Sequence, residues 1–258
     1  MKKNLANEQR HAGASAIPGR IRLWDLPVRI FHWTLTVVVT IAIISAELDD
    51  DLMEIHGKAG ITIIGLVVFR LIWGIIGSTH ARFANFVPGL SDIRSYMKGR
   101  WKNVGHNPIG ALSVLALLLL LAAQAGTGLF ANDDIDFTGP LANLVETTLS
   151  DQLTGIHHLL ANFLLGLIAL HIIAIGFYFF VKKDNLIKPM ITGWKEVKPE
   201  MLPQATTPSG FRGSPAAFVI ACLIALAVAG VVSGAARHTE TVAAKVSACT
   251  FSVAQRSA

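Results

Sequence analysis

Long apolar runs alternate with short polar segments along this chain. A helix needs about 20 consecutive apolar residues to cross about 30 Å of hydrocarbon. Five runs reach that length: 28–46, 56–77, 109–130, 157–180 and 215–236. Stretches such as ALSVLALLLLLAA show no alternation of polar and apolar positions, so they predict helices rather than strands of a membrane barrel. We therefore expect an all-α integral membrane protein.

The composition supports a bilayer environment. The chain has 258 residues, of which 52% are hydrophobic and 15% charged, whereas soluble domains are about 25% charged. The net charge of +5 comes from the loops between the runs. It therefore does not indicate nucleic-acid binding.

The charged residues change sign from one polar segment to the next. The N-terminal arm to residue 29 has six Lys/Arg and two acids, and segments 78–107 and 181–214 are also predominantly basic. Segments 47–55 and 131–156 each have five acids and no base. Because basic loops stay in the cytoplasm, we expect a multi-pass protein of the bacterial inner membrane.

This orientation predicts the domain layout. It comprises a cytoplasmic N-terminal arm (1–27), a four-helix bundle (28–187), a cytoplasmic linker (188–214), a fifth transmembrane helix (215–236) and a periplasmic tail (237–258). Two loop segments are amphipathic, GLSDIRSYMKGRW on the inside and GPLANLVETTL on the outside.

Histidines stand at two depths in the fourth run. An α-helix turns 100° and rises 1.5 Å per residue. His157 and His171 are 14 residues apart, which leaves them about 40° apart around the helix and about 21 Å apart along it. His158 lies about 140° from His171, so we expect its ring to point towards backbone or lipid headgroups. One helix face therefore presents His157 and His171, one near each side of the bilayer.

His32 and His56 stand at matching depths in the first two runs. His32 lies near the cytoplasmic start of the first run, and His56 begins the second run on the outside. The alternating helix directions bring His56 to the depth of His157 and His32 to that of His171. Two imidazoles that face each other across a bundle provide the axial ligands of a haem iron.

Other cofactor chemistries have less support. Four histidines at two depths do not form one tetrahedral zinc site. Cys222 and Cys249 belong to no CxxC or CxxCH motif, so neither a disulfide scaffold nor covalently attached haem is indicated.

Two charged residues, Lys58 and Arg70, lie inside the runs when Arg29 is counted with the N-terminal arm. Charges within a membrane need partners. Arg70 follows His56 by 14 residues on the same helix face, so a haem propionate could neutralise it, and Lys58 could serve the outer haem in the same way. Both side chains are also long enough to snorkel to water.

Several glycines accompany the histidines. Gly57, Gly60 and Gly65 follow His56, and Gly166 lies between the histidines of the fourth run. Small residues allow close approach of either a flat macrocycle or a neighbouring helix. The sequence leaves both interpretations open.

Four stretches carry a family resemblance: WDLPVRIFHW, HGKAGITIIGLVVFRLIWGIIGSTHARF, GHNPIGALSVLALLLLL and HHLLANFLLGLIALH. Over roughly residues 20–195, the chain resembles the bacterial cytochrome b561 family, which includes the cytochrome b subunits of nickel-iron hydrogenases. The resemblance implies a four-helix bundle with two b-type haems. It implies that His32 faces His171 and that His56 faces His157 as axial ligands. The fifth helix and tail depart from the shortest members and leave the partner open.

These observations predict transmembrane electron transfer between a periplasmic redox protein or enzyme subunit and a quinone or another acceptor. The cofactors carry the redox chemistry, so we expect no catalytic side chain. A haem-bearing anchor of a hydrogenase-like complex is an alternative. A proton or ion transporter with histidine relays is another, although the five runs contain no acidic residue to couple to them. His106 begins the third helix or lines a quinone or proton site.

Overall fold

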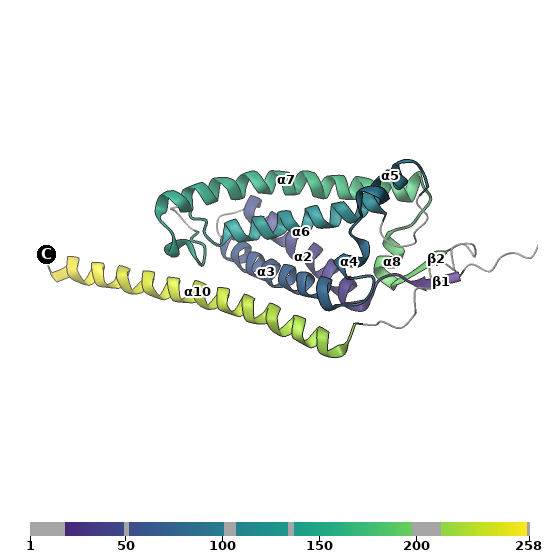
Figure 1. Cartoon of the computed structure of the whole chain (residues 1–258). Helices are drawn as coiled ribbons and strands as arrows, with labels where there is room; N and C mark the ends of the chain where they lie inside the picture. Colours follow the sequence, from purple (N-terminus) through teal and green to yellow (C-terminus); the bar gives the residue numbers. More distant parts are fainter. Residues whose placement is uncertain (1–18, 49–51, 101–106, 134–136, 198–212, 257–258) are drawn as a thin grey trace, which may run out of the picture.

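Long helices dominate the fold (Figure 1). The computed structural model describes residues 19–48, 52–100, 107–133, 137–197 and 213–256, without the side chains of 197 and 238–256. The helices are α2 (Leu26–Leu48), α3 (Met53–Ile76), α6 (Pro108–Gly128), α7 (Thr147–Phe180) and α10 (Pro215–Arg256). Each contains an apolar stretch long enough to cross a membrane. The predicted all-α integral membrane fold with a fifth helix is therefore confirmed.

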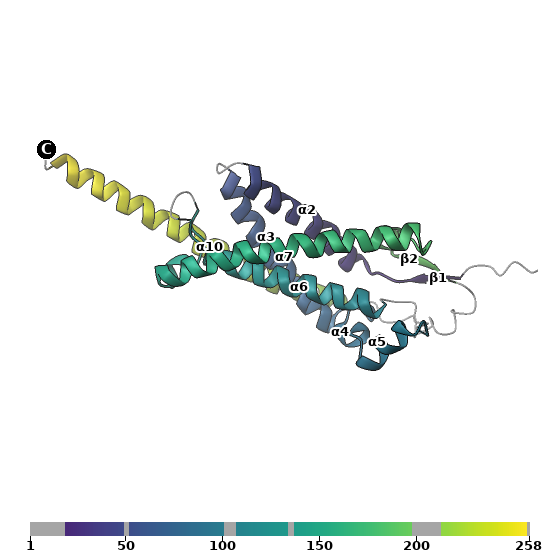
Figure 2. The same ribbon diagram turned by 90° about the horizontal axis from the view of Figure 1, so that it is seen from above.

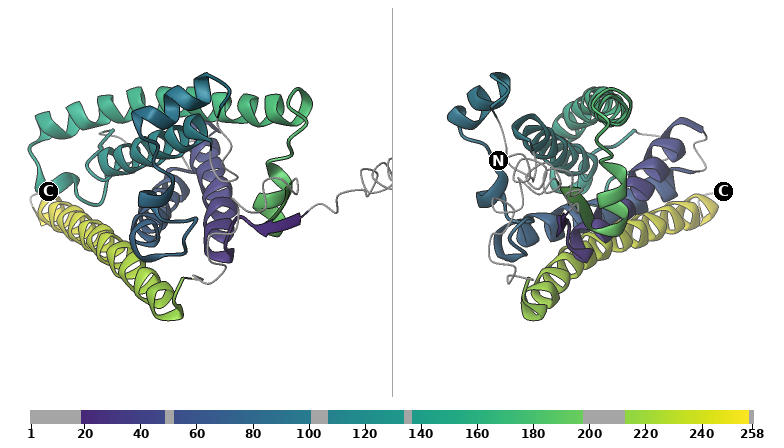
Figure 3. Two further views of the ribbon diagram at one scale, coloured as in Figure 1. Left: turned by 45° about the vertical axis from the view of Figure 1, so that its right-hand side comes forward. Right: turned by 90° about the vertical axis from the view of Figure 1, so that its right-hand side faces the viewer.

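The first four long helices are arranged as a bundle. Helix α2 packs against α3, α3 against α6, and α6 against α7. Helix α10 packs on α3, so α7 and α10 lie on opposite sides of the molecule (Figures 1 and 3). We call the end where α3 and α7 begin the acidic end, and the end where they finish the basic end.

Two apolar clusters stabilise the bundle. The first includes Phe31, Phe69 and Trp73 and extends to Ala221 and Ala225 of α10. The second joins all four bundle helices, through Val39 and Ala42 of α2, Ala59, Ile63 and Val67 of α3, Leu121 of α6 and Leu164 of α7. Several members of this second cluster also line the cavity described in the next section.

Local sequence signals explain where two helices begin. The Asp25 carboxylate accepts a hydrogen bond from Val28 N at 2.8 Å, at the start of α2. Asn107 Oδ1 accepts one from Gly110 N at 2.7 Å, and Pro108 occupies the first turn of α6. Both arrangements satisfy backbone N–H groups that have no partner within the helix.

Two helices are longer than the apolar runs predict. Helix α7 begins at Thr147, ahead of the run that starts at 157, and α10 continues to Arg256, beyond the predicted end at 236. Hydropathy marks only the part of a helix suited to lipid, whereas backbone hydrogen bonds continue into polar sequence.

Short elements gather at the basic end. They are α4 (Phe83–Phe86), α5 (Leu90–Met97), α8 (Ile187–Thr192) and a two-stranded antiparallel sheet of β1 (Gly19–Arg22) and β2 (Trp194–Val197), in which Gly19 pairs with Val197 and Arg22 with Trp194. The sheet and α5 lie at the same end of the bundle (Figure 2). Helix α5 falls in the amphipathic inner segment, whereas the outer segment contains only the short 3₁₀ turn η2 (Ala142–Leu144) before α7. The small sheet departs from the all-α expectation, as does an isolated β-bridge between Asn132 and Thr138.

Candidate functional site

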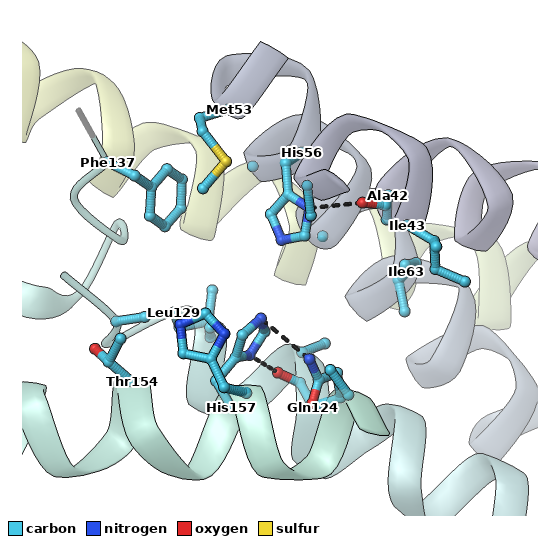
Figure 4. A pocket seen from close by; sticks show the side chains of 18 of the residues that line it. Ala42, Ile43, Met53, His56, Ile63, Gln124, Leu129, Phe137, Thr154 and His157 are labelled. Carbon is cyan, nitrogen blue, oxygen red and sulfur yellow. Dashed lines mark hydrogen bonds between the residues drawn. The ribbon is translucent and has the colours of Figure 1, made fainter. Parts of the chain in front are cut away.

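A cavity of about 310 Å³ opens between the bundle helices towards the acidic end. Its walls are mainly apolar and come from α2, α3, α6, α7 and the segment between α6 and α7. Lining residues include Val39, Ile63, Leu121, Phe137 and Leu164. His56 and His157 project into it from opposite sides (Figure 4). The volume is in the range of small-molecule and cofactor sites.

His56 is supplied by the first turn of α3. Its Nδ1 is 2.8 Å from the Ala42 carbonyl oxygen of α2. Because a carbonyl only accepts hydrogen bonds, Nδ1 carries the proton and Nε2 carries the lone pair. This is the arrangement in which metal-binding histidines are usually held, with one ring nitrogen donating to the protein and the other free to ligate.

His157 is held in the same tautomer by α6. Its Nδ1 is 2.9 Å from the Gln124 carbonyl oxygen, and Thr127 Oγ1 is 3.2 Å from the same nitrogen. The Nε2 atom accepts from the Gln124 side-chain amide at 3.1 Å. The lone pair that would bind iron is thus on Nε2, and the flexible amide beside it would have to turn away.

The separation of these two rings suits one metal ion between them. Their centroids are 6.1 Å apart, with ring planes at 84°. A metal–imidazole bond of about 2 Å on each side and about 1 Å from each nitrogen to its ring centre add up to about 6 Å. The structure therefore brings together the pair that the sequence matched by depth, and the donor set fits a six-coordinate haem iron.

The second pair lies nearer the basic end. His32 of α2 and His171 of α7 are within electrostatic range of each other. His32 Nδ1 is buried and has no hydrogen-bond partner within the described part of the chain. A buried polar nitrogen without a partner is unfavourable by about 1–3 kcal/mol. A cofactor that ligates both of these imidazoles stays a prediction.

His158 differs from its prediction. It lines the same cavity as His157, and the two ring centroids are 6.3 Å apart. Helix α7 borders the cavity closely enough for two consecutive residues to reach it. The second residue, His158, is exposed and therefore lies at the rim. His106, considered for a quinone or proton site, lies outside the described residues.

The structure shows which glycines leave space for a ligand and which allow contact between helices. A Cβ built on Gly60 would meet nothing within 4 Å, and Gly60 lines the cavity, so it leaves room there for a flat ligand. A Cβ on Gly65 would lie 3.4 Å from Ala229 Cβ and 3.6 Å from the Ala225 carbonyl oxygen, so Gly65 serves contact with α10. Gly57 faces Phe137 at the mouth of the cavity, and Gly166 faces open space.

The two charged residues of the spans have protein neighbours. Arg70 is buried, donates to the Ala81 carbonyl oxygen at 3.2 Å and has its guanidinium 4.7 Å from the centre of the Phe83 ring. Lys58 is exposed and forms an ion pair with Glu54 one turn earlier. Lys58 therefore reaches water with its ammonium group, as snorkelling predicts. A contact of Lys58 or Arg70 with a haem propionate stays a prediction.

Sequence reasoning missed Gln124. This residue both orients His157 through its carbonyl and reaches the ligand nitrogen through its amide, while its Oε1 is buried with no partner in the described chain. The available signal was a single amide within the apolar run ALSVLALLLLLAAQ.

Known proteins are similar to this chain over much of its length. Two relatives called "Probable Ni/Fe-hydrogenase B-type cytochrome subunit" come from Azotobacter chroococcum mcd 1 and Azotobacter vinelandii. Each is 25% identical over 219 residues, covering 69% of this chain and 89% of the relative. No solved structure matches significantly. A family model for prokaryotic cytochrome b561 matches residues 23–193, which include all four histidines of the two pairs. The chain therefore belongs to the prokaryotic cytochrome b561 family, whose cofactor is b-type haem.

Proposed function

We propose that the protein carries electrons across the membrane through two b-type haems. His56 and His157 would hold one near the acidic end, and His32 and His171 would hold the other near the basic end. The main support is the pair of cavity imidazoles, whose centroids are 6.1 Å apart and whose lone pairs lie on Nε2. Bound haem supplies the one-electron chemistry.

The side chains of this protein would do three things in that reaction. The carbonyl oxygens of Ala42 and Gln124 hold the Nδ1–H groups, so that each Nε2 stays aimed at the iron position. The apolar walls exclude water, which lowers the local dielectric and helps to set the redox potential. Helix α7 carries His157 and His171 about 21 Å apart along its axis, so one rigid element sets the spacing between the two sites.

The orientation follows from the charged segments. The basic end, with the N-terminal arm, would face the cytoplasm of a bacterial inner membrane, and the acidic end would face the periplasm. A periplasmic enzyme subunit or redox protein would exchange electrons with the outer site, and a quinone or another acceptor with the inner site. The names of the two Azotobacter relatives favour a hydrogenase as that periplasmic partner.

The test compares adjacent histidines. Purified wild-type protein should contain two low-spin haems, measured by haem extraction and by the absorbance change on reduction. His157→Ala should retain one haem, whereas His158→Ala, one residue away and also at the cavity, should retain two. His171→Ala should lose the other haem, which is distinguished by its own midpoint potential.

Two results would contradict the proposal. Wild-type protein that is folded and monodisperse but binds no haem would remove electron transfer altogether. Equal haem loss in His157→Ala and His158→Ala would contradict the assignment of ligands.

A further inference from the structure

Helix α5 and the turn after it form a basic hollow that no histidine lines. The hollow has a volume of about 380 Å³ and lies at the basic end. It is lined by Leu90, Ser91, Arg94, Ser95, Lys98 and Arg100. None of these described lining residues is acidic. The hollow therefore combines three cationic groups with two hydroxyl groups.

The spacing along α5 places its polar and apolar side chains on different sides. Ser91, Arg94, Ser95 and Lys98 fall within about 100° of one another at 100° per residue. Leu90 and Met97 are seven residues apart, which leaves them only about 20° apart on a neighbouring side. They are 87% and 73% exposed. A helix that exposes both apolar and basic side chains is typical of a membrane surface.

Hydrogen bonds hold α5 at the depth where the bundle leaves the bilayer. Tyr96 Oη of α5 is 2.7 Å from Tyr178 Oη near the end of α7. Asn107, which caps α6, donates to the same Tyr178 oxygen at 2.7 Å. Lys182 and Lys183 follow shortly after Tyr178. Since these bonds join α5 to the start of one span and the end of another, α5 lies at the level of the lipid headgroups.

The basic side chains of α5 and the turn after it have no ion pair within the described residues. Arg94, Lys98 and Arg100 are exposed. The one acid of the helix, Asp92, accepts from the Gly89 backbone N–H at 2.9 Å and lies outside the hollow. No carboxylate among the described residues of the hollow therefore competes with an external anion for Arg94, Lys98 and Arg100.

We propose that this hollow binds the phosphate of an anionic phospholipid from the leaflet on the basic side. The guanidinium groups of Arg94 and Arg100, the Lys98 ammonium group and the two serine hydroxyls are donors suited to phosphate oxygens. Leu90 and Met97 lie beside them, where the acyl chains begin. The site is independent of the haem ligands, so its test is separate from that of electron transfer.

The experiment measures lipid bound to the full-length protein. Protein purified in mild detergent is titrated with phosphatidylglycerol or phosphatidylcholine, and bound lipid is counted by native mass spectrometry. On the scale of about 1 kcal/mol per cation at a membrane surface, each basic side chain that lines the hollow and contacts the phosphate should contribute about fivefold in affinity. We therefore expect Arg94→Gln/Lys98→Gln to weaken phosphatidylglycerol binding by about 25-fold. The matched control, Lys182→Gln/Lys183→Gln, removes two charges at the same membrane face that do not line the hollow. Because salt screens charges that do not contact the bound phosphate, this variant should change binding less than about threefold.

The outcomes separate the possible sources of the anion. Phosphatidylglycerol that binds more tightly than phosphatidylcholine, and that excess inorganic phosphate does not displace, supports the lipid site. Equal weakening in the two double variants would show only a general charge effect and overturn the proposal, as would equal binding of both lipids. Displacement by inorganic phosphate would overturn it in favour of a free anion. If the double variant loses helix content, Arg94→Gln alone, with an expected fivefold loss, provides the same comparison.

Discussion

The Asp25 carboxylate connects the start of α2 to the end of α3. Its Oδ1 accepts from Val28 N at 2.8 Å. Its Oδ2 accepts from Trp73 Nε1 at 3.0 Å and from the Ser78 hydroxyl. Asp25 also interacts electrostatically with the buried Arg70 guanidinium. We predict that Asp25→Ala destabilises the basic end of the bundle strongly, although Asp25 is not a haem ligand.

The size of the effect follows from these contacts. Loss of a helix cap costs about 1 kcal/mol, and loss of two hydrogen bonds to a charged acceptor costs about 1.5 kcal/mol each at the lower end of the range. Because Asp25 is half-buried, water replaces part of the lost hydrogen bonding. We therefore expect the free energy of unfolding to fall by about 3 kcal/mol. Asp25→Asn keeps an oxygen acceptor and should lose about 1 kcal/mol.

The assay is reversible unfolding in mixed micelles, followed by circular dichroism. The expected decrease in Tm is about 6–12 °C for Asp25→Ala. Asp151→Ala, which removes an exposed acid of α7, serves as control and should stay within about 0.5 kcal/mol of wild type. A loss below about 1 kcal/mol for Asp25→Ala, or equal losses for the Ala and Asn variants, would refute the reasoning.

Three further predictions concern packing, haem space and pH. Gly65→Leu should push α10 off α3 and lower the Tm, whereas Gly65→Ala should be tolerated because its Cβ meets neighbours no closer than 3.4 Å; thermal unfolding of both variants measures this. Gly60→Leu should fill the cavity, so extraction should recover one haem rather than two, whereas the Tm of the haem-free variant should stay close to that of haem-free wild type because a Cβ on Gly60 meets nothing within 4 Å. Burial lowers the pKa of His80 below its ordinary 6.5, against a smaller opposite effect of Asp25. The unfolded chain therefore binds a proton at His80 at higher pH than the folded chain does, so the free energy of unfolding should decrease as pH falls below about 6.5. The test compares unfolding of wild type and His80→Gln at about pH 7.5 and about pH 5. The variant should lack the part of this pH dependence that comes from His80.

The five-helix membrane fold was predictable because its signals are local. Lipid requires long apolar helices whose backbone groups are satisfied internally, and hydropathy records this requirement in each run separately. The match between His157 and His171 was predictable for a similar reason, because helix periodicity alone places residues 14 apart on one face.

Contacts between distant segments were not predictable in the same way. The pairing of β1 with β2 joins residues near 20 to residues near 195, and neither strand is long enough to show a clear alternation. Gln124 looked like one polar residue in an apolar run, and its position against His157 depends on how α6 and α7 pack.

The sequence by itself determined that the chain forms membrane-spanning helices with imidazoles at two depths, because span length and helix periodicity act within single segments. Only the tertiary structure decided that His56 and His157 share one cavity, that His158 stands at its rim, and that Gly65 receives α10 while Gly60 leaves open space. These outcomes depend on the rotation and separation of neighbouring helices, which are set by side-chain packing between residues far apart in the chain.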